Sequence, residues 1–176
     1  MTPRPLVLFG AFDRHNLGDL LFPHLLAERF PGREIRFAGL ANRDMRPFGG
    51  HRVLGIGDLG AGWEGPPAEL LHVGGEILDC DAWTAAVMLC GHDEARQAVA
   101  RLDADPAGRS SWAAEFLGTA SPAPYVLEKA ALRWCAWLGF HAAGGVDLAR
   151  RDAALRRHVA GALGQADRVG VRDSVT

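Results

Sequence analysis

The sequence predicts an α/β domain with a doubly wound, mostly parallel, Rossmann-like sheet that carries helices on both faces. Three observations support this fold class. Apolar runs of strand length recur along the 176 residues, and they are continuous, which is typical of strands buried on both faces. Segments with helical spacing of apolar residues lie between several of these runs. The composition, with 48% hydrophobic and 23% charged residues, is typical of a chain with a single globular core.

Each element is assigned from its apolar pattern and from the residues that bound it. Strands are predicted, in chain order, at 5–10, 34–39, 52–56, 70–73, 135–140 and 168–171. Helices are predicted at 20–30, 82–90, 93–102, 125–133 and 147–163. Polar stretches rich in glycine and proline predict loops at 41–50, 57–67, 103–111 and 118–124. Strands that alternate with helices in this way favour a parallel sheet.

Charge and cysteine content exclude several classes of protein. The net charge is −2, and the 19 basic residues, of which Lys129 alone is a lysine, form no basic stripe, so we expect no nucleic-acid partner. Cys80, Cys90 and Cys135 follow no metal-binding spacing and predict a reduced, cytoplasmic location. The sequence has no apolar stretch long enough for a transmembrane segment. We expect neither a metal nor a cofactor.

The first strand leads into a segment that is typical of a ligand-binding turn. Gly10 can make the tight turn, and Asn16, Gly18 and Asp19 follow at the predicted start of a helix. Pro23 would then fall in the first helical turn, provided that the helix begins at or just after Asp19. The alternative is that these residues form only a turn and a helix cap.

A second predicted strand ends at the paired glycines Gly74 and Gly75, which are followed by Glu76. Two glycines allow positive φ or a close approach of the backbone to a ligand, and the adjacent carboxylate could exchange a proton. The alternative is a glycine turn with Glu76 in solvent. Asp79 and Asp81 resemble the DxD pair that holds a divalent metal in some glycosyltransferases, but capping of the next helix is the simpler interpretation.

Two further strands also end in residues that can carry chemistry. His141 follows one strand and precedes Gly144 and Gly145, where it could act as a general acid or bind an anion. Arg172 and Asp173 follow the last strand, and Arg172 could bind a phosphate or carboxylate. The alternatives are that His141 only packs against its neighbours, and that Arg172 and Asp173 form an ion network that stabilises the edge of the sheet.

Four segments in order carry a resemblance to a known family. They are NLGD after the first strand, HVGGEILD in mid-chain, WLGFHAAGG further on and ADRVGVRDSVT at the end. In order and approximate spacing they resemble the polysaccharide pyruvyl transferase family. That family has a third glycine in the mid-chain turn where this chain has Glu76. No GxSxG, HExxH, GxxxxGK[ST] or GxGxxG motif competes with this interpretation.

The resemblance implies the amino-terminal half of a two-domain, GT-B-like enzyme, with residues 1–176 as a single Rossmann-like domain and the carboxyl-terminal domain missing. It implies transfer of pyruvyl from phosphoenolpyruvate to sugar hydroxyls as a ketal, in exopolysaccharide or cell-wall glycan modification. The acceptor would be a glycan or a lipid-linked sugar. By this resemblance Asp19 and Glu76 are the catalytic candidates, while the substrate-binding candidates are Asn16, Gly18, Gly74, Gly75, His141 and Arg172. A nucleotide-sugar glycosyltransferase domain and a non-catalytic binding domain are the alternatives.

Overall fold

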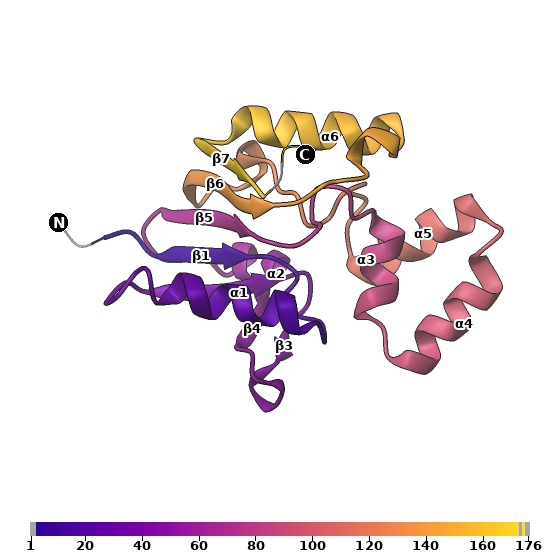
Figure 1. Ribbon diagram of the computed structural model, residues 1–176, viewed down its shortest axis with the longest axis horizontal. Coiled ribbons are helices and arrows are strands. Elements are labelled where there is room, and N and C mark those ends of the chain that lie inside the picture. The colour runs from indigo at the N-terminus through magenta and orange to yellow at the C-terminus, as the bar shows by residue number, and fades with distance from the viewer. Residues whose placement is uncertain (1–2, 173, 175–176) are drawn as a thin grey trace.

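The computed structural model describes residues 3–172 and 174, which form one seven-stranded sheet in the order β3-β4-β2-β1-β5-β6-β7 (Figure 1). The strands are β1 (Leu6–Phe9), β2 (Ile35–Gly39), β3 (Arg43–Asp44), β4 (Arg52–Gly55), β5 (Ala68–Val73), β6 (Cys135–Ala143) and β7 (Arg168–Val171). Every pairing is parallel except that between β3 and β4. The predicted α/β class with a mostly parallel sheet is therefore confirmed.

The strand order has one reversal point, between β1 and β5. From β1 the chain moves outward through β2 to β4, and it then returns to β5 and moves outward again through β6 to β7. This is the doubly wound, Rossmann-like order, in which ligands bind outside the carboxyl ends of the strands at the reversal. The loops that follow β1 and β5 are therefore the first place to look for a site.

Helices lie on both faces of the sheet, as the sequence predicts. The α-helices are α1 (Leu17–Ala27), α2 (Ile56–Ala61), α3 (Ala82–Leu89), α4 (His92–Leu102), α5 (Pro106–Leu117) and α6 (Ala153–Gln165). Short 3-10 turns lie at η1 (Arg46–Phe48), η2 (Lys129–Ala131) and η3 (Leu148–Arg150). α1 packs on one face, which we call the α1 face, and α2 and α6 pack on the other, which we call the α6 face (Figure 1).

Alternate residues of each strand divide between two cores. On β1, Val7 and Phe9 point to the α6 face, while Leu6 and Leu8 point to the α1 face. This division follows from the two-residue period of a strand. Because both sets are buried, β1 has the continuous apolar sequence that predicted its central place.

All six strands predicted from the sequence are present, but the regions between them differ from prediction, beginning with the short strand β3 inside the predicted loop at 41–50. Segment 125–133 is not a helix apart from the turn η2, because Tyr125 is buried under the sheet instead of on a helical face. α2 and α5 lie where loops were predicted. Asp105 caps α5 by accepting from the Gly108 N–H, Pro106 occupies its first turn and Gly118 ends it with φ +64°. These capping residues had suggested a loop.

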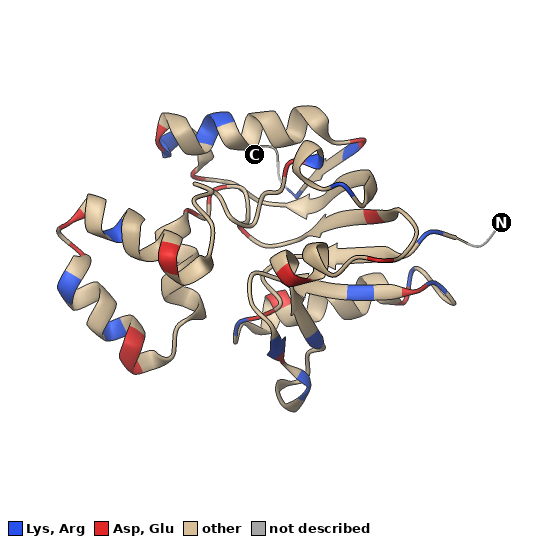
Figure 2. Ribbon diagram, turned by 180° about the vertical axis from the view of Figure 1, so that it is seen from behind, with Lys and Arg blue, Asp and Glu red and all other residues tan. Residues whose placement is uncertain are grey.

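α3, α4 and α5 form a helical excursion between β5 and β6. They project beyond the carboxyl ends of the strands, to the right of the sheet in Figure 1. Acidic and basic residues are interspersed along this excursion and around the sheet, and the ribbon shows no long segment of one charge (Figure 2). Within the described part of the chain, no helix has the length and apolar character needed to cross a membrane.

Candidate functional site

The loop after β1 passes very close to β5. A Cβ atom added to Gly10 would lie 2.7 Å from the carbonyl oxygen of Val73 and 2.9 Å from the ring of Phe12. Contacts this short are not tolerated between real atoms, so the position requires glycine. The prediction that Gly10 makes the tight turn is explained by this packing.

Asp13 anchors the same loop from inside the protein. Its side chain is fully buried and accepts hydrogen bonds from the backbone N–H groups of Leu40 and Ala41, at 2.6 and 2.9 Å, and from the Tyr125 hydroxyl at 3.2 Å. Burial raises the pKa of the Asp13 carboxyl above its ordinary value, against the opposing effect of these hydrogen bonds. Asp13 therefore joins the ends of β1 and β2. Asp13 was not predicted as a site residue, although it lies within the segment that follows the first strand.

α1 begins three residues earlier than predicted. Asn16, not Asp19, is the N-cap, since its side-chain oxygen accepts from the Gly18 N–H at 3.0 Å. Gly18 itself is exposed. The interpretation of Asp19 as the cap is wrong, and Pro23 lies inside the helix, not in its first turn. Pro23 is buried there. The free energy gained by burying its ring offsets part of the cost of the backbone hydrogen bond that proline cannot make.

Asp19 is buried in the first turn of α1 and is paired with an arginine. The Arg14 guanidinium lies 2.9 and 3.0 Å from Asp19 Oδ2 through two of its nitrogens, which is a charge-assisted contact. Arg14 also lies over the Tyr125 ring at 5.8 Å and donates to Met88 on α3. The sequence analysis did not single out Arg14. The sequence signal that could have predicted the pair is the position of Arg14, a basic residue, five positions before the candidate carboxylate Asp19.

Gly74 and Gly75 both have left-handed backbone conformations, with φ of +58° and +71°. The prediction that this pair supplies positive φ is confirmed. A Cβ atom at Gly75 would lie 3.0 Å from Asp19 Oδ1, and one at Gly74 would lie 2.6 Å from the Phe22 ring. The two glycines thus bring the loop after β5 directly against the start of α1.

Glu76 lies on the same loop and forms an ion pair with Arg172, which follows β7. Glu76 Oε2 also accepts from the Val146 N–H at 3.3 Å. A Cβ atom at Gly144 would lie within 3 Å of both Glu76 and Arg172, so the glycine after β6 makes room for the pair. Both side chains are partly exposed, at 35% for Glu76 and 43% for Arg172.

The end of β6 is irregular at the point where it meets this pair. Ala142 has φ +53°, an uncommon conformation for a residue with a side chain, and the pairing of β6 with β7 shifts register between Phe140 and Ala143. Gly75 and Gly144 then join the two loops, since the Gly144 N–H donates to the Gly75 carbonyl at 2.8 Å. Strained backbone of this kind is concentrated at functional sites.

The structure separates the other candidates from these two pairs. His141 lies on the α1 face, where it lines a groove beside Phe22. Asp81 caps α3 by accepting from the Thr84 N–H at 2.7 Å, as the simpler interpretation had it, and Asp79 accepts from the Asp147 N–H at 2.9 Å. Among the described residues no group of three metal-binding side chains is found. Asp173 lies outside the described residues.

Loops from four different strands thus meet at the carboxyl edge of the sheet. The loops after β1 and β5 supply the pair of Asp19 with Arg14 and the residue Glu76, and those after β6 and β7 supply Gly144 and Arg172. We call this set the carboxyl-edge cluster. Carboxylates can move protons and arginines can bind anionic oxygens, so the cluster has the groups needed for acid–base chemistry on an anionic substrate. Comparisons of the chain with protein-family models, with curated proteins and with solved structures give no match.

Proposed function

We propose that this chain is a polysaccharide pyruvyl transferase-like domain, which takes part in moving a pyruvyl group from phosphoenolpyruvate onto two hydroxyls of a sugar. One observation carries the proposal. Two carboxylates, each beside an arginine, follow β1 and β5 at the reversal point of the sheet, one in the first turn of α1 and one in a loop, and the positive-φ glycines of that loop lie against the start of α1. The resemblance of the sequence segments supplies the reaction class. The product would be a cyclic ketal in an exopolysaccharide or cell-wall glycan.

The reaction needs proton transfers and the binding of anions. C3 of phosphoenolpyruvate gains a proton and becomes a methyl group, while a sugar hydroxyl loses its proton and bonds to C2. The bond between C2 and the phosphate oxygen then breaks, and phosphate leaves with the electron pair. The second hydroxyl loses its proton as it bonds to C2. General acid–base groups and positive charges near the donor lower the barrier to these steps.

The residues of the carboxyl-edge cluster fit these requirements. Asp19 or Glu76 would move a proton, and Arg172 would hold the carboxylate or phosphate of the donor in place of its present partner Glu76. Asn16, Gly18, Gly74 and Gly75 would form the backbone wall around the substrate. In a two-domain enzyme the facing domain would supply the other wall.

Calorimetric titration tests the class of ligand. We expect phosphoenolpyruvate to bind the 176-residue chain, and we expect Arg172→Ala to weaken binding at least about tenfold through the loss of a charge-assisted contact. Arg101→Ala, on the exposed surface of α4, is the matched control. Binding of uridine diphosphate instead would favour the glycosyltransferase alternative, which the Rossmann-like strand order also fits. Binding of neither would favour a non-catalytic domain.

Turnover tests the two carboxylates. In an enzyme that contains this domain, Asp19→Asn and Glu76→Gln should each lower kcat by at least about a hundredfold, with little change in Tm. Asp93→Asn, on the first turn of α4, is the matched control. Phosphate release that stays near the unsubstituted rate in both variants would remove these two residues from the mechanism.

A further inference from the structure

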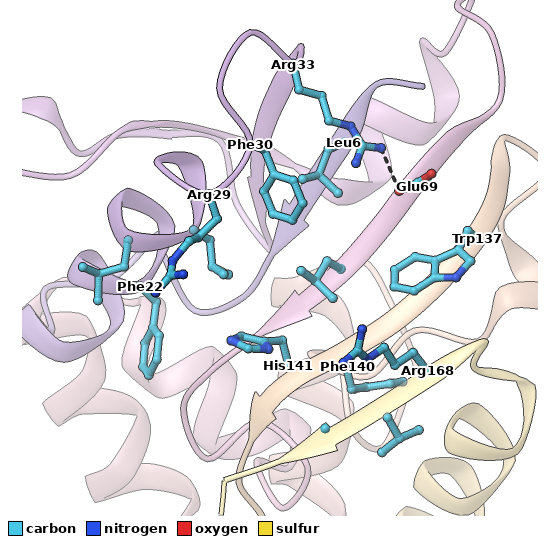
Figure 3. Close-up of a pocket in the computed structure, with 15 residues that line it drawn as sticks. Leu6, Phe22, Arg29, Phe30, Arg33, Glu69, Trp137, Phe140, His141 and Arg168 are labelled. Carbon is cyan, nitrogen blue, oxygen red and sulfur yellow. Dashed lines mark ion pairs between the residues drawn. The ribbon is translucent and has the colours of Figure 1, made fainter. Parts of the chain in front are cut away.

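A groove of about 760 Å³ runs along the α1 face of the sheet, between α1 and β7 (Figure 3). It exists because α1 packs over the β1 side of this face, while no described helix covers β5, β6 and β7 there. Its volume is within the range of about 300–1,000 Å³ that is usual for small-molecule sites. It is separate from the carboxyl-edge cluster, because neither Asp19 nor Glu76 lines it.

The groove is lined mainly by apolar side chains. Leu71 of β5 and Trp137 of β6 line its floor, and a Cβ atom at Gly139 would lie 2.4 Å from the Trp137 ring, so the indole lies along its own strand. Leu25 on α1, which is 51% exposed, lies at the edge of this floor. An apolar side chain this exposed beside an apolar floor favours an apolar ligand.

The polar groups of the groove are positive. Arg33 is neutralised by Glu69, with 2.7 Å between their charged atoms. Arg29 and Arg168 have no acidic partner among the described residues, and Figure 3 shows them on either side of His141. Unpaired guanidinium groups beside an apolar surface attract a phosphate or a carboxylate.

We propose that this groove binds an amphiphilic anion, a molecule with an alkyl or prenyl chain and a phosphate or carboxylate head. The chain would lie over Leu71 and Trp137, and the head would contact Arg29 and Arg168. A purely apolar ligand would leave both arginines without a partner, and a free anion would leave the apolar floor exposed. The proposal does not depend on the chemistry of the carboxyl-edge cluster.

Titration with decyl phosphate, below its critical micelle concentration, tests the site. Binding is followed by calorimetry and by tryptophan fluorescence, because Trp137 lies in the groove. We expect decyl phosphate to bind at least about tenfold more tightly than decanol or inorganic phosphate, since each of these has only one of the two parts. Decanoate shows whether a carboxylate head replaces the phosphate. The fluorescence change should be lost in Trp137→Phe while the calorimetric signal remains.

Two sets of variants locate the site. Arg29→Ala with Arg168→Ala should weaken decyl phosphate at least about tenfold and leave decanol unchanged, whereas Arg96→Ala and Arg101→Ala on α4 should change neither. Leu25→Asp should weaken both. Decanol binding equal to that of decyl phosphate, inorganic phosphate binding as tightly, or no binding at all would overturn the proposal. A concentration-dependent dimer that Leu25→Asp dissociates would overturn it too, by assigning the groove to a second copy.

Discussion

On the α6 face of the sheet, α2, α6 and the segment from Ala123 to Trp134 cover the central strands, whereas on the α1 face a single helix covers little more than β1. The strands are the same, so the difference comes from the connections. The crossover from β2 to β4 is a short hairpin strand and a 3-10 turn where a helix would have filled the α1 face. The crossover from β6 to β7 is the helix α6, but it packs on the α6 face and leaves these strands open on the α1 face. A face of a doubly wound sheet is therefore closed only where a helical crossover packs against it.

Two histidines, one buried and one partly buried, illustrate the contrast. His72, on the α6 face, is fully enclosed, donates from Nδ1 to the Gly139 carbonyl oxygen at 3.2 Å, and accepts at Nε2 from the Leu127 N–H at 3.0 Å. His51, on the α1 face, stacks on Phe37, and its Nε2 has no hydrogen-bond partner among the described residues. Desolvation lowers the pKa of His72 to about 3 and that of His51 to about 4. The better-closed face holds the more strongly shifted group.

The largest expected effect is the acid sensitivity that His72 confers. Its folded pKa of about 3 lies below the ordinary value of 6.5, so only the unfolded chain binds the proton as the pH falls from 6.5 to 3. Stability is fully present above pH 6.5 and declines below it by about 1.4 kcal/mol per pH unit, to a total of roughly 4 to 5 kcal/mol. Urea unfolding between pH 7 and about pH 4 measures this slope. His72→Gln should flatten it, and His92→Gln on α4 should not.

The next effect compares one leucine on each face. Leu138→Ala removes a side chain that is 0% exposed under α6, and it should lower the free energy of unfolding by about 2–5 kcal/mol. Leu25→Ala removes one that is 51% exposed beside the groove, and it should change stability by no more than about 0.5 kcal/mol. Both values come from denaturant unfolding at neutral pH. Equal losses would mean that something covers the α1 face in solution.

A smaller effect is expected at a crowded point of the α1 face. Gly74→Ala combines a positive φ of +58° with a clash 2.6 Å from the Phe22 ring, and it should cost about 2 kcal/mol or more. Gly118→Ala is the matched control, because its φ is +64° and, apart from its chain neighbours, no atom of the described residues lies within 4 Å of the added Cβ. It should cost about 1 kcal/mol. If the two variants lose the same stability, Phe22 moves away and the groove is wider than described.

The smallest effect belongs to the ion pair at the rim of the groove. Glu69→Gln leaves Arg33 without its charged partner at 2.7 Å and should cost no more than about 1 kcal/mol, because Glu69 is partly exposed and a glutamine oxygen can still accept from the buried Arg33 nitrogen. The loss should shrink in about 1 M salt, where charges are screened. The same variant adds a third unpaired arginine to the groove, and decyl phosphate should bind more tightly. A weaker affinity would contradict the assigned role of the positive charge.

Local pattern was sufficient for the strands and insufficient for the segments between them. Every predicted strand is present. For β1 and β5 the reason is that burial on two faces is visible as a continuous apolar run, whereas β7 has an apolar pattern although it is mostly exposed. Segment 125–133 was mistaken for a helix because Tyr125 and its neighbours are apolar for a tertiary reason: they fill space beneath the sheet. α5 was missed because its proline and glycine are capping residues, which have the composition of a loop.

For the carboxyl-edge cluster, the sequence singled out the loops but not their internal partners. Asp19, Gly75, Glu76 and Arg172 all follow strands, and parallel strands carry their carboxyl ends to one edge. Asp13 and Arg14 were missed, since their importance depends on contacts with residues as distant in the chain as Tyr125 and Met88. The spacing of residues along the chain does not predict contacts between residues so far apart.

The sequence by itself determined the fold class, the strands and the loops that could hold a ligand, because apolar periodicity and glycine position are local properties. The tertiary structure decided which side chains pair, and it placed His141 in the groove of the α1 face instead of the carboxyl-edge cluster. It also decided that the groove exists at all. The groove is present because no described helix covers this part of the sheet. Which face a helix covers depends on the face that each crossover packs against, and no single segment of the chain specifies that.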